Sequence, residues 1–484
     1  MRWILLLLFL SSCLLRTPFH DPSVDLPCKW RLETNEASVW ANIRWWEQFG
    51  DPTLNCLIKE ALWNNEDLQI AVARVVEYYG KLGIVRASLY PEINGNGSFV
   101  RQRTSQVVFP PIPPNISPVY NTYELFATLN YQLDVWGQLH SATDAAVSEF
   151  WSAIENRKQA VLTLVQSVAR GYIFLRQLDE QLQISKDTLK SRIESLRLAV
   201  LRFEEGLTSE VEVMQATAER DTAALQVVEY ETDIQVQENL LSVLVGRNPG
   251  PICRGLELQK LTLPFDVPAG LPAELLEQRP DISKARFDLM AAAFRVNVAL
   301  ANFFPQINLT GAYGNASTEL HQLLTSPALI WQYGINFLQP LFDGGRIASG
   351  VVEAKAIRDE LLHTYFSVIQ HAFAEVDDAL ISHKNSKVLI LIQQDQVKSL
   401  RRYLYLATLQ YNNGQTDYLN VLDAERSLFS SQLNLAAAQG NAFFTLIDLY
   451  AALGGGWVID ADDTLRGKEE SQEVVPGPNP CDSL

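Results

Sequence analysis

Residue types that could carry chemistry are present in this chain, but their spacing matches no reactive motif. The five cysteines include no C-x-x-C pair, and the six histidines include no H-x-x-x-H or H-E-x-x-H metal site. Glycines 344–345 and 454–456 lack the spacing of a phosphate-binding loop, so we interpret them as turns. The sequence has no nucleophile elbow and no Ser-His-Asp order. We therefore expect a protein that is not an enzyme and that uses no metal and no cofactor.

One group of side chains has a spacing that suits a helix. Leu419, Asp423 and Arg426 stand at i, i+4 and i+7, which places all three on one helix face. Because Arg426 follows Asp423 by three residues, the two can form an ion pair, worth roughly 0.3 kcal/mol when exposed. Taken alone, these residues favour a solvated ion pair on a helix surface.

The N-terminal residues have the features of a lipoprotein signal. Arg2 precedes an apolar run over residues 3–10 that is too short to span a bilayer as a helix. Residues 10–13, Leu-Ser-Ser-Cys, resemble a bacterial lipobox, in which the cysteine is diacylated and becomes the mature N-terminus. We predict a signal peptide over residues 1–12 and lipidation at Cys13; a plain signal peptide with an incidental cysteine is the alternative. Leu rather than Asp follows the cysteine, so we expect the outer membrane.

Composition excludes two other classes of protein. Of 484 residues, 47% are apolar and 20% charged, so the chain can bury a large core and is not globally disordered. A net charge of −17, without a dense Lys/Arg cluster, argues against a nucleic-acid partner. After residue 13 no apolar run is long enough for a transmembrane helix. Cys28, Cys56, Cys253 and Cys481 lie far apart, which leaves their disulfide pairing open.

The sequence contains two copies of one long unit. Residues 67–93 align with 281–307, and residues 203–225 align with 411–433 after an offset of six residues. A unit of this length is not a short solenoid repeat. We divide the chain into a signal peptide (1–12), an N-terminal anchor segment (13–52), a first repeat (53–247), a linker (248–271), a second repeat (272–458) and an acidic flexible tail (459–484).

Each copy includes two segments with the period of a β-strand. Residues 123–135 alternate between apolar and polar, with Phe126 as the exception, which predicts one apolar and one wet face. The predicted strands cover residues 92–108, 119–135, 306–318 and 329–342. This length suits tilted strands in a membrane. The aromatic residues placed to line its interfaces are Tyr90, Tyr123, Tyr131, Trp331 and Tyr333.

Four strands cannot close a barrel by themselves. In lipid, an open sheet edge leaves backbone groups unpaired at a cost of several kcal/mol each. If these strands span a membrane, several chains must therefore pool them. A soluble four-stranded sheet with one buried face stays open as the alternative, because alternation alone fits both.

The remaining segments predict unusually long helices. Residues 138–205 contain no proline and a single glycine, and their apolar positions alternate in steps of three and four, as in a coiled coil. The expected buried face comprises Val165, Val168, Tyr172, Leu175, Leu182, Leu189, Ile193, Leu196, Val200 and Phe203. The other expected helices cover residues 209–245, 346–411 and 417–453. Turns near Gly206 and Gly414 make a helical hairpin in each copy; a plain coiled-coil spacer is the alternative, which the inserted strands argue against.

A series of motifs runs in order along residues 40–458. They are Trp45-Trp46-x-x-Phe49-x-Asp51-Pro52-x-Leu54, Asn65-x-Asp67-Leu68-x-x-Ala71, Tyr131-x-Leu133-Asp134-Val135-Trp136-Gly137, Arg279-Pro280-Asp281-Ile282, Pro340-Leu341-Phe342-Asp343-Gly344-Gly345-Arg346, Tyr411-x-x-Gly414, Leu422-Asp423-Ala424 and Leu449-Tyr450-Ala451-Ala452-Leu453-Gly454-Gly455-Gly456-Trp457. On this duplicated frame the chain resembles the outer-membrane factor family of TolC and OprM. It is most similar to the lipoprotein branch, the OprM/NodT-like efflux channels.

The resemblance implies an α+β membrane protein that works as a homotrimer. Long antiparallel coiled-coil helices would form an α-barrel, and four strands per chain would complete a twelve-stranded β-barrel. The N-terminal segment 13–52 and the linker 248–271 would form an equatorial belt around the tunnel. The implied function is the exit channel of a tripartite efflux system, which passively conducts small molecules. Its implied partners are a periplasmic adaptor, an inner-membrane pump of the RND type and outer-membrane lipid. Two alternatives are the exit duct of a type I protein-secretion system and a non-conducting coiled-coil lipoprotein of the envelope.

The resemblance also assigns roles to single residues. The family's periplasmic gate falls on Leu419, Asp423 and Arg426. A leucine ring would narrow and dry the bore, and three aspartates near one axis would repel each other and attract cations. The family's second gate aspartate is Asn420 here, which departs from a gate of two aspartate rings. The implied adaptor-docking tips are Gly206, Thr208, Gly414 and Thr416.

Overall fold

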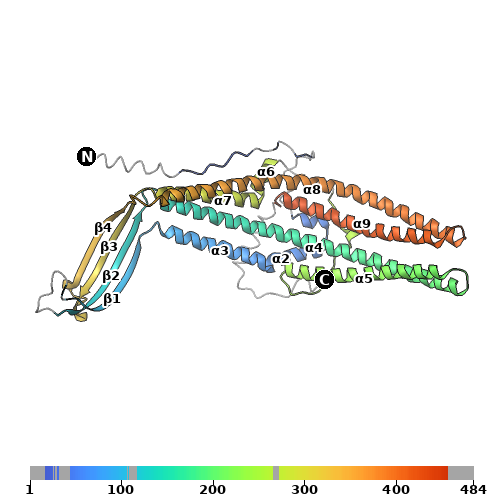
Figure 1. The fold of residues 1–484 in the computed structure, drawn as a ribbon, viewed down its shortest axis with the longest axis horizontal. Helices are drawn as coiled ribbons and strands as arrows, with labels where there is room; N and C mark the ends of the chain where they lie inside the picture. The colour runs from blue at the N-terminus through green and yellow to red at the C-terminus, as the bar shows by residue number, and fades with distance from the viewer. Residues whose placement is uncertain are drawn as a thin grey trace. The chain divides into compact units, whose positions relative to one another are not determined.

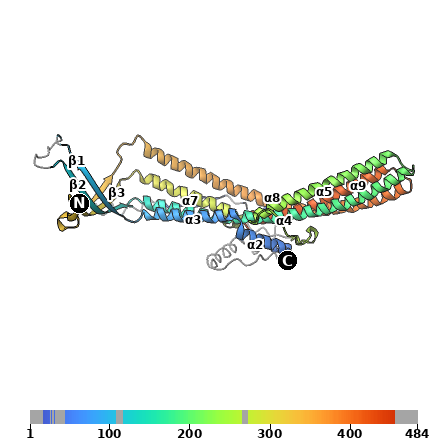
Figure 2. The ribbon, with the colours of Figure 1, turned by 90° about the horizontal axis from the view of Figure 1, so that it is seen from below.

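The computed structural model describes residues 17–24, 27, 30–31, 44–105, 107, 117–264 and 272–455 (Figures 1 and 2). The predicted signal peptide, the lipidation site Cys13 and the acidic tail lie outside the described residues. The chain divides into two compact units. Unit 1 comprises Met1–Ser23, Arg74–Ile154 and Lys284–Phe366, and unit 2 comprises Val24–Ala73, Glu155–Ser283 and Ser367–Leu484.

Unit 1 contains a four-stranded antiparallel sheet in the order β1-β2-β3-β4. The strands are β1 (Glu92–Arg103), β2 (Val119–Leu133), β3 (Gln306–Ser317) and β4 (Leu329–Leu338). Phe126 in β2 lies opposite Asn96 in β1 and Gly314 in β3, so the two copies meet at the β2–β3 ladder. β4 ends before the predicted residue 342, because Pro340 lacks the amide hydrogen that a ladder needs.

Many large apolar side chains of the sheet, above all in β1 and β4, are exposed in the single chain. Ile93 is 68% exposed, Trp331 63% and Tyr333 83%. A soluble antiparallel sheet would bury one face against a core. The alternative of a soluble sheet with one buried face is therefore wrong for this chain.

The helices repeat their lengths between the two copies. α3 (Glu66–Ala87) and α7 (Pro280–Ala301) each have 22 residues, α4 (Gln138–Glu204) and α8 (Arg346–Asn412) each have 67, and α5 (Glu210–Leu244) and α9 (Tyr418–Ala452) each have 35. The shorter elements are η3 (Trp45–Phe49), α2 (Pro52–Asn64), η4 (Leu258–Lys260), α6 (Pro272–Gln278), η5 (Leu320–Gln322) and η6 (Ser326–Ala328). Among the described residues, no helix combines the length and hydropathy needed to cross a bilayer.

The hairpin turns are built alike in the two copies. Gly206 and Gly414 both have φ of 67°, a conformation that glycine adopts without strain. After α4, the amide of Leu207 donates to the carbonyl of Arg202 at 2.8 Å, which closes the helix end in a Schellman motif. The amide of Gln415 makes the matching bond after α8. These bonds explain why the turns fall where the glycines predict them.

The core of unit 2 is organised around a buried aspartate. Asp51 caps α2 by accepting from the amide of Thr53 at 2.8 Å. Its other oxygen accepts from the Tyr172 hydroxyl at 2.6 Å and from the amide of Leu256 at 3.1 Å. The Tyr172 hydroxyl in turn accepts from the amide of Gly255 at 2.9 Å. One carboxylate thus ties the N-terminal segment, α4 and the linker after α5 together.

The predicted coiled-coil face of α4 is only partly the buried one. Its first part, including Val165, Val168 and Tyr172, is fully buried. Further along, Ile193 is 47% exposed, and the buried positions are Ser185, Arg192 and Ala199. We attribute the error to the heptad rule, which assumes that apolar residues face the partner helix.

Two of the cysteines left open by the sequence are now assigned. Cys56 is disulfide-bonded, and Cys253 is free and exposed. Cys28 and Cys481 lie outside the described residues. The disulfide fits an oxidising compartment such as the bacterial envelope.

Candidate periplasmic gate

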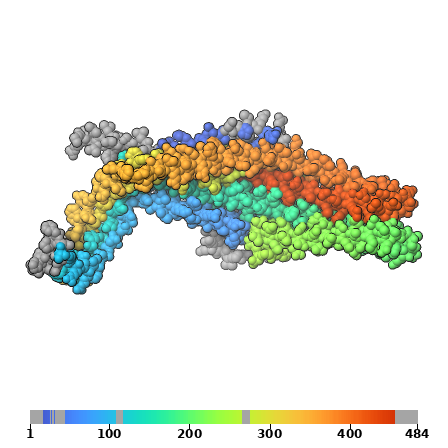
Figure 3. Space-filling model, in the orientation of Figure 1, coloured from blue at the N-terminus to red at the C-terminus, as the bar shows by residue number. Residues whose placement is uncertain are grey.

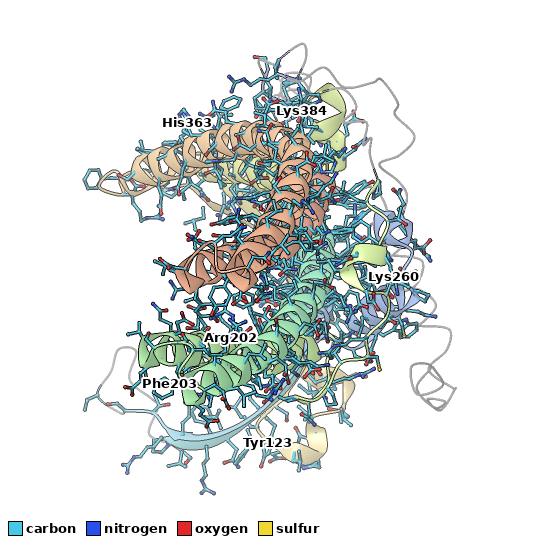
Figure 4. All side chains as sticks on the ribbon, turned by 90° about the vertical axis from the view of Figure 1, so that its right-hand side faces the viewer. Tyr123, Arg202, Phe203, Lys260, His363 and Lys384 are labelled. Carbon is cyan, nitrogen blue, oxygen red and sulfur yellow. The ribbon has the colours of Figure 1, made fainter. Side chains whose placement is uncertain are left out.

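The residues assigned to the gate lie near the turns of two hairpins in unit 2. α4 and α5 form one hairpin, α8 and α9 form the other, and Figure 4 looks along them with Arg202 and Phe203 labelled on the first. A small core of mostly small or branched residues joins them. It comprises Ala199, Ala216, Ala407, Tyr418, Val421, Leu422 and Ala424.

α9 turns one face to this core and the other to solvent. Val421 and Leu422 are buried, at 5% and 1% exposure. Leu419 is 58% exposed, and Asp423 and Arg426 are also exposed. The three residues that the sequence assigned to the gate therefore share one exposed helix face.

Arg426 does not pair with Asp423. Its guanidinium forms an ion pair with the carboxylate of Glu219 on α5. Asp423 instead accepts a long hydrogen bond, 3.4 Å, from the hydroxyl of Tyr403 on α8. The solvated Asp423–Arg426 pair expected from spacing alone is thus replaced, in the part of the chain that the structure describes, by a contact between hairpins.

Glu219 is shared by two arginines. Its carboxylate also pairs with Arg192 of α4, and its backbone carbonyl accepts from the same guanidinium at 2.8 Å. The side chains of Arg192 and Glu219 are only 3% and 6% exposed. The Arg192 guanidinium also lies 5.5 Å from the ring centre of Phe429 on α9. The sequence did not predict roles for Glu219 and Arg192. Glu219 lies 207 residues from Arg426, and no local pattern indicates a contact between residues so far apart in the chain.

A second carboxyl group lies beside this ion-pair network. Burial raises the pKa of Glu425, the positive charge of Arg192 lowers it, and the negative charge of Glu219 raises it, with a net upward shift. One Glu425 oxygen and the Arg192 Nε are buried without a hydrogen-bond partner. Burial likewise raises the pKa of Tyr418, which Glu425 and Glu219 raise further. The packing of α9 against α4 and α5 therefore favours a neutral Glu425.

The residues assigned to adaptor docking form the ends of the hairpins. Gly206 and Gly414 are exposed, and Thr208 and Thr416 are half-buried. The two ends are also linked, since the guanidinium of Arg202 lies 4.9 Å from the ring centre of Tyr411. These contacts place both turns at one end of unit 2 as a continuous surface.

Comparisons with known proteins identify the class. The sequence model of the outer membrane efflux protein family matches residues 57–247 and 271–455, one match for each repeat. The chain belongs to this family, whose members are transport channels and not enzymes. It is an efflux channel of the bacterial outer membrane.

Individual relatives match over nearly their whole length. The chain is 33% identical over 462 residues to TtgC of Pseudomonas putida, a probable efflux pump outer membrane protein, with 93% of each chain covered. It is 29% identical to SilC of Salmonella typhimurium, a probable outer membrane lipoprotein, covering 93% of this chain and 97% of SilC. The crystal structure of the CmeC outer membrane channel of Campylobacter jejuni has a TM-score of 0.84 at 26% identity, covering 95% of this chain and 98% of CmeC.

Proposed function

We propose that three copies of this chain form the exit duct of a tripartite efflux system, through which small molecules leave passively. The observation that supports this most directly is the sheet of unit 1, in which many large apolar side chains are exposed. Its outer strands, β1 and β4, each pair with only one other strand among the described residues, so each leaves one edge unpaired. Such edges cannot stay open in lipid. Twelve pooled strands close them, and the same symmetry brings the helical hairpins into one tunnel.

In this trimer, Leu419 and Asp423 form the constriction at the periplasmic end. Three leucines pack across the bore and exclude water. Because Arg426 is held by Glu219, it leaves the Asp423 carboxylates without a counter-charge from their own helix. Three such carboxylates near one axis repel each other and favour cations. With Asn420 one turn earlier, the gate has one aspartate ring.

The partners follow from the hairpin tips and from the N-terminal lipobox. The tip residues Gly206, Thr208, Gly414 and Thr416 dock a periplasmic adaptor, which connects the duct to an inner-membrane pump of the RND type. That TtgC carries the name of an efflux pump component supports a pump partner. A diacylated Cys13 anchors the chain in outer-membrane lipid, and the name of SilC as a lipoprotein supports this anchor.

Single-channel conductance in a planar bilayer tests the gate. The native protein should give small, cation-selective openings, and Asp423→Ala should lower the cation selectivity and enlarge the openings. Asp221→Ala is the matched control, since it removes an exposed aspartate from the other hairpin. Equal conductance of Asp423→Ala and the native channel would refute this gate but keep the duct. The duct would be refuted if the double variant Leu419→Gly with Asp423→Ala also showed no conductance and the protein proved monomeric.

A further inference from the structure

The described N-terminal residues 17–22 form one wall of a groove in unit 1. Two pairs of hydrogen bonds hold this segment against α7. The Thr17 hydroxyl donates to Asn297 at 2.7 Å, and the Asn297 amide donates back to the Thr17 carbonyl at 3.2 Å. Arg286 donates to both carboxylate oxygens of Asp21, at 2.5 and 2.8 Å. With α7 and α8 as the other walls, the segment encloses a groove of about 490 Å³.

The groove combines an apolar interior with basic side chains. Its main apolar residues are Phe19, Leu289, Val296, Leu300 and Leu362. The ionisable residues that line it are His20, Lys355 and Arg358, and no carboxylate lines it. This is unusual in a chain with 56 acidic and 39 basic residues. Asp359 holds Arg358 through Nε at 3.0 Å and Nη2 at 2.6 Å, whereas Lys355 forms no ion pair within the described residues.

The groove lies close along the chain to the sheet. α7 ends five residues before β3 begins, and Leu300, in the last turn of α7, lines the groove. The segment between β4 and α8 carries Leu341 and Phe342, which are 95% and 93% exposed. Lys355 and Arg358 lie nine and twelve residues into α8, roughly 14 and 18 Å along its axis. The groove thus reaches the last turn of α7 and includes two cations of α8.

We propose that this groove binds an anionic phospholipid from the inner leaflet of the outer membrane. The phosphate sits between Lys355 and Arg358, whose positive charges suit a phosphate anion. One acyl chain runs along α7 past Val296 and Leu300 toward the sheet, where burial of its methylene groups stabilises it. Basic pockets beside membrane-embedded segments recognise lipid headgroups by the same combination of forces. The groove residues belong to unit 1 and the candidate gate residues to unit 2, so a failed gate leaves this site intact.

Native mass spectrometry of the full-length protein tests the site. The protein is released from nanodiscs of phosphatidylglycerol or of phosphatidylcholine with the same acyl chains, and retained lipid is counted per chain. We expect one retained phosphatidylglycerol, and a loss on the order of tenfold in Lys355→Glu combined with Arg358→Glu. Lys384→Glu is the matched control, because Lys384 is an exposed lysine of α8 outside the groove (Figure 4). Figure 3 shows the α8 surface in light orange.

Further variants separate a lipid from other occupants. Leu300→Glu should weaken phosphatidylglycerol retention, because the acyl chain of the lipid uses the apolar wall. Inorganic phosphate added as a competitor should displace the remaining lipid equally well from this variant and from the native protein, because phosphate contacts only the two cations. Lys355→Gln with Arg358→Gln repeats the test without charge reversal, and trimer melting shows whether each variant is folded. Equal retention of the two lipids, or equal losses in the double variant and the Lys384 control, would refute the site. A gain of retained phosphatidylglycerol in Cys13→Ser would assign the groove of the native chain to its own acyl groups and overturn the proposal.

Discussion

The shared carboxylate of Glu219 allows a prediction whose size follows from burial. Glu219→Gln removes the negative charge that faces Arg192, whose side chain is 3% exposed. Breaking a buried ion pair from one side costs about 3–5 kcal/mol, because the remaining charge stays buried without compensation. Arg426 is 56% exposed, so Arg426→Ala should cost less than about 1 kcal/mol. The two substitutions break contacts to one carboxylate, yet their expected costs differ several-fold.

Hydrogen exchange of the hairpin ends measures this difference as local opening. Since about 1.4 kcal/mol corresponds to a factor of ten, Glu219→Gln should reduce amide protection in α4 and α5 by roughly a hundred- to a few thousand-fold. Arg426→Ala should reduce it by about fivefold at most. The matched control is Glu231→Gln, which breaks an exposed pair between the same two helices, Lys186–Glu231, with side chains 47% and 46% exposed.

The three variants should rank by the burial of the ion pair that each one breaks. Equal protection in Glu219→Gln and in the Glu231→Gln control would mean that Arg192 reaches water or another anion in solution. A larger effect of Arg426→Ala than of Glu219→Gln would mean that Arg426 carries a contact beyond Glu219, such as one to a neighbouring chain. Only a loss confined to Glu219→Gln supports a buried pair within one chain.

Two further predictions concern pH and the sheet. Burial raises the pKa of the Glu425 carboxyl, so the packing of α9 against α4 and α5 is more stable when this group is protonated. The stabilisation is fully present below the ordinary pKa of 4.5 and is lost as pH rises through the raised pKa. Glu425→Gln should flatten this pH dependence of hydrogen exchange, and an unchanged profile would contradict it. Gly314→Ala should abolish heat-modifiable trimers on gels, since its Cβ would lie 2.7 Å from the Phe126 Cα. Gly334→Ala, which meets only Thr310 Oγ1 at 3.6 Å, should leave them intact.

The elements of the fold are predictable because their signals are local. The alternation over residues 123–135 is sufficient to identify β2. Gly206 and Gly414 locate the turns, because glycine adopts without strain the positive φ with which many helices end. The strand ends are less predictable, since the pairing of β1 with β2 ends at Arg103, five residues before the predicted end at residue 108. Periodicity therefore specifies which elements form, and pairing specifies where they stop.

The contacts of the candidate gate are not predictable in the same way. Arg192 stands at a position where the heptad rule expects a solvated side chain, and it is buried because Glu219 and Phe429 lie opposite it. Arg426 has an acceptor three residues away in sequence, yet binds one 207 residues away. Both outcomes depend on how the hairpins pack, and a single sequence carries no record of that packing.

Asp423 and Arg426 of the candidate gate have charged side chains in the second copy only. α5 and α9 begin 208 residues apart and have equal lengths, so Ala216 and Ala424 correspond, and both are buried. On this offset Asp423 corresponds to Gln215 and Arg426 to Ala218, neither of which is charged. Glu219, which holds Arg426, has no acidic counterpart at position 427 either. The two copies thus form similar hairpins that differ at three corresponding positions. At these positions the second hairpin has Asp423 and Arg426, and the first has Glu219, which pairs with Arg426.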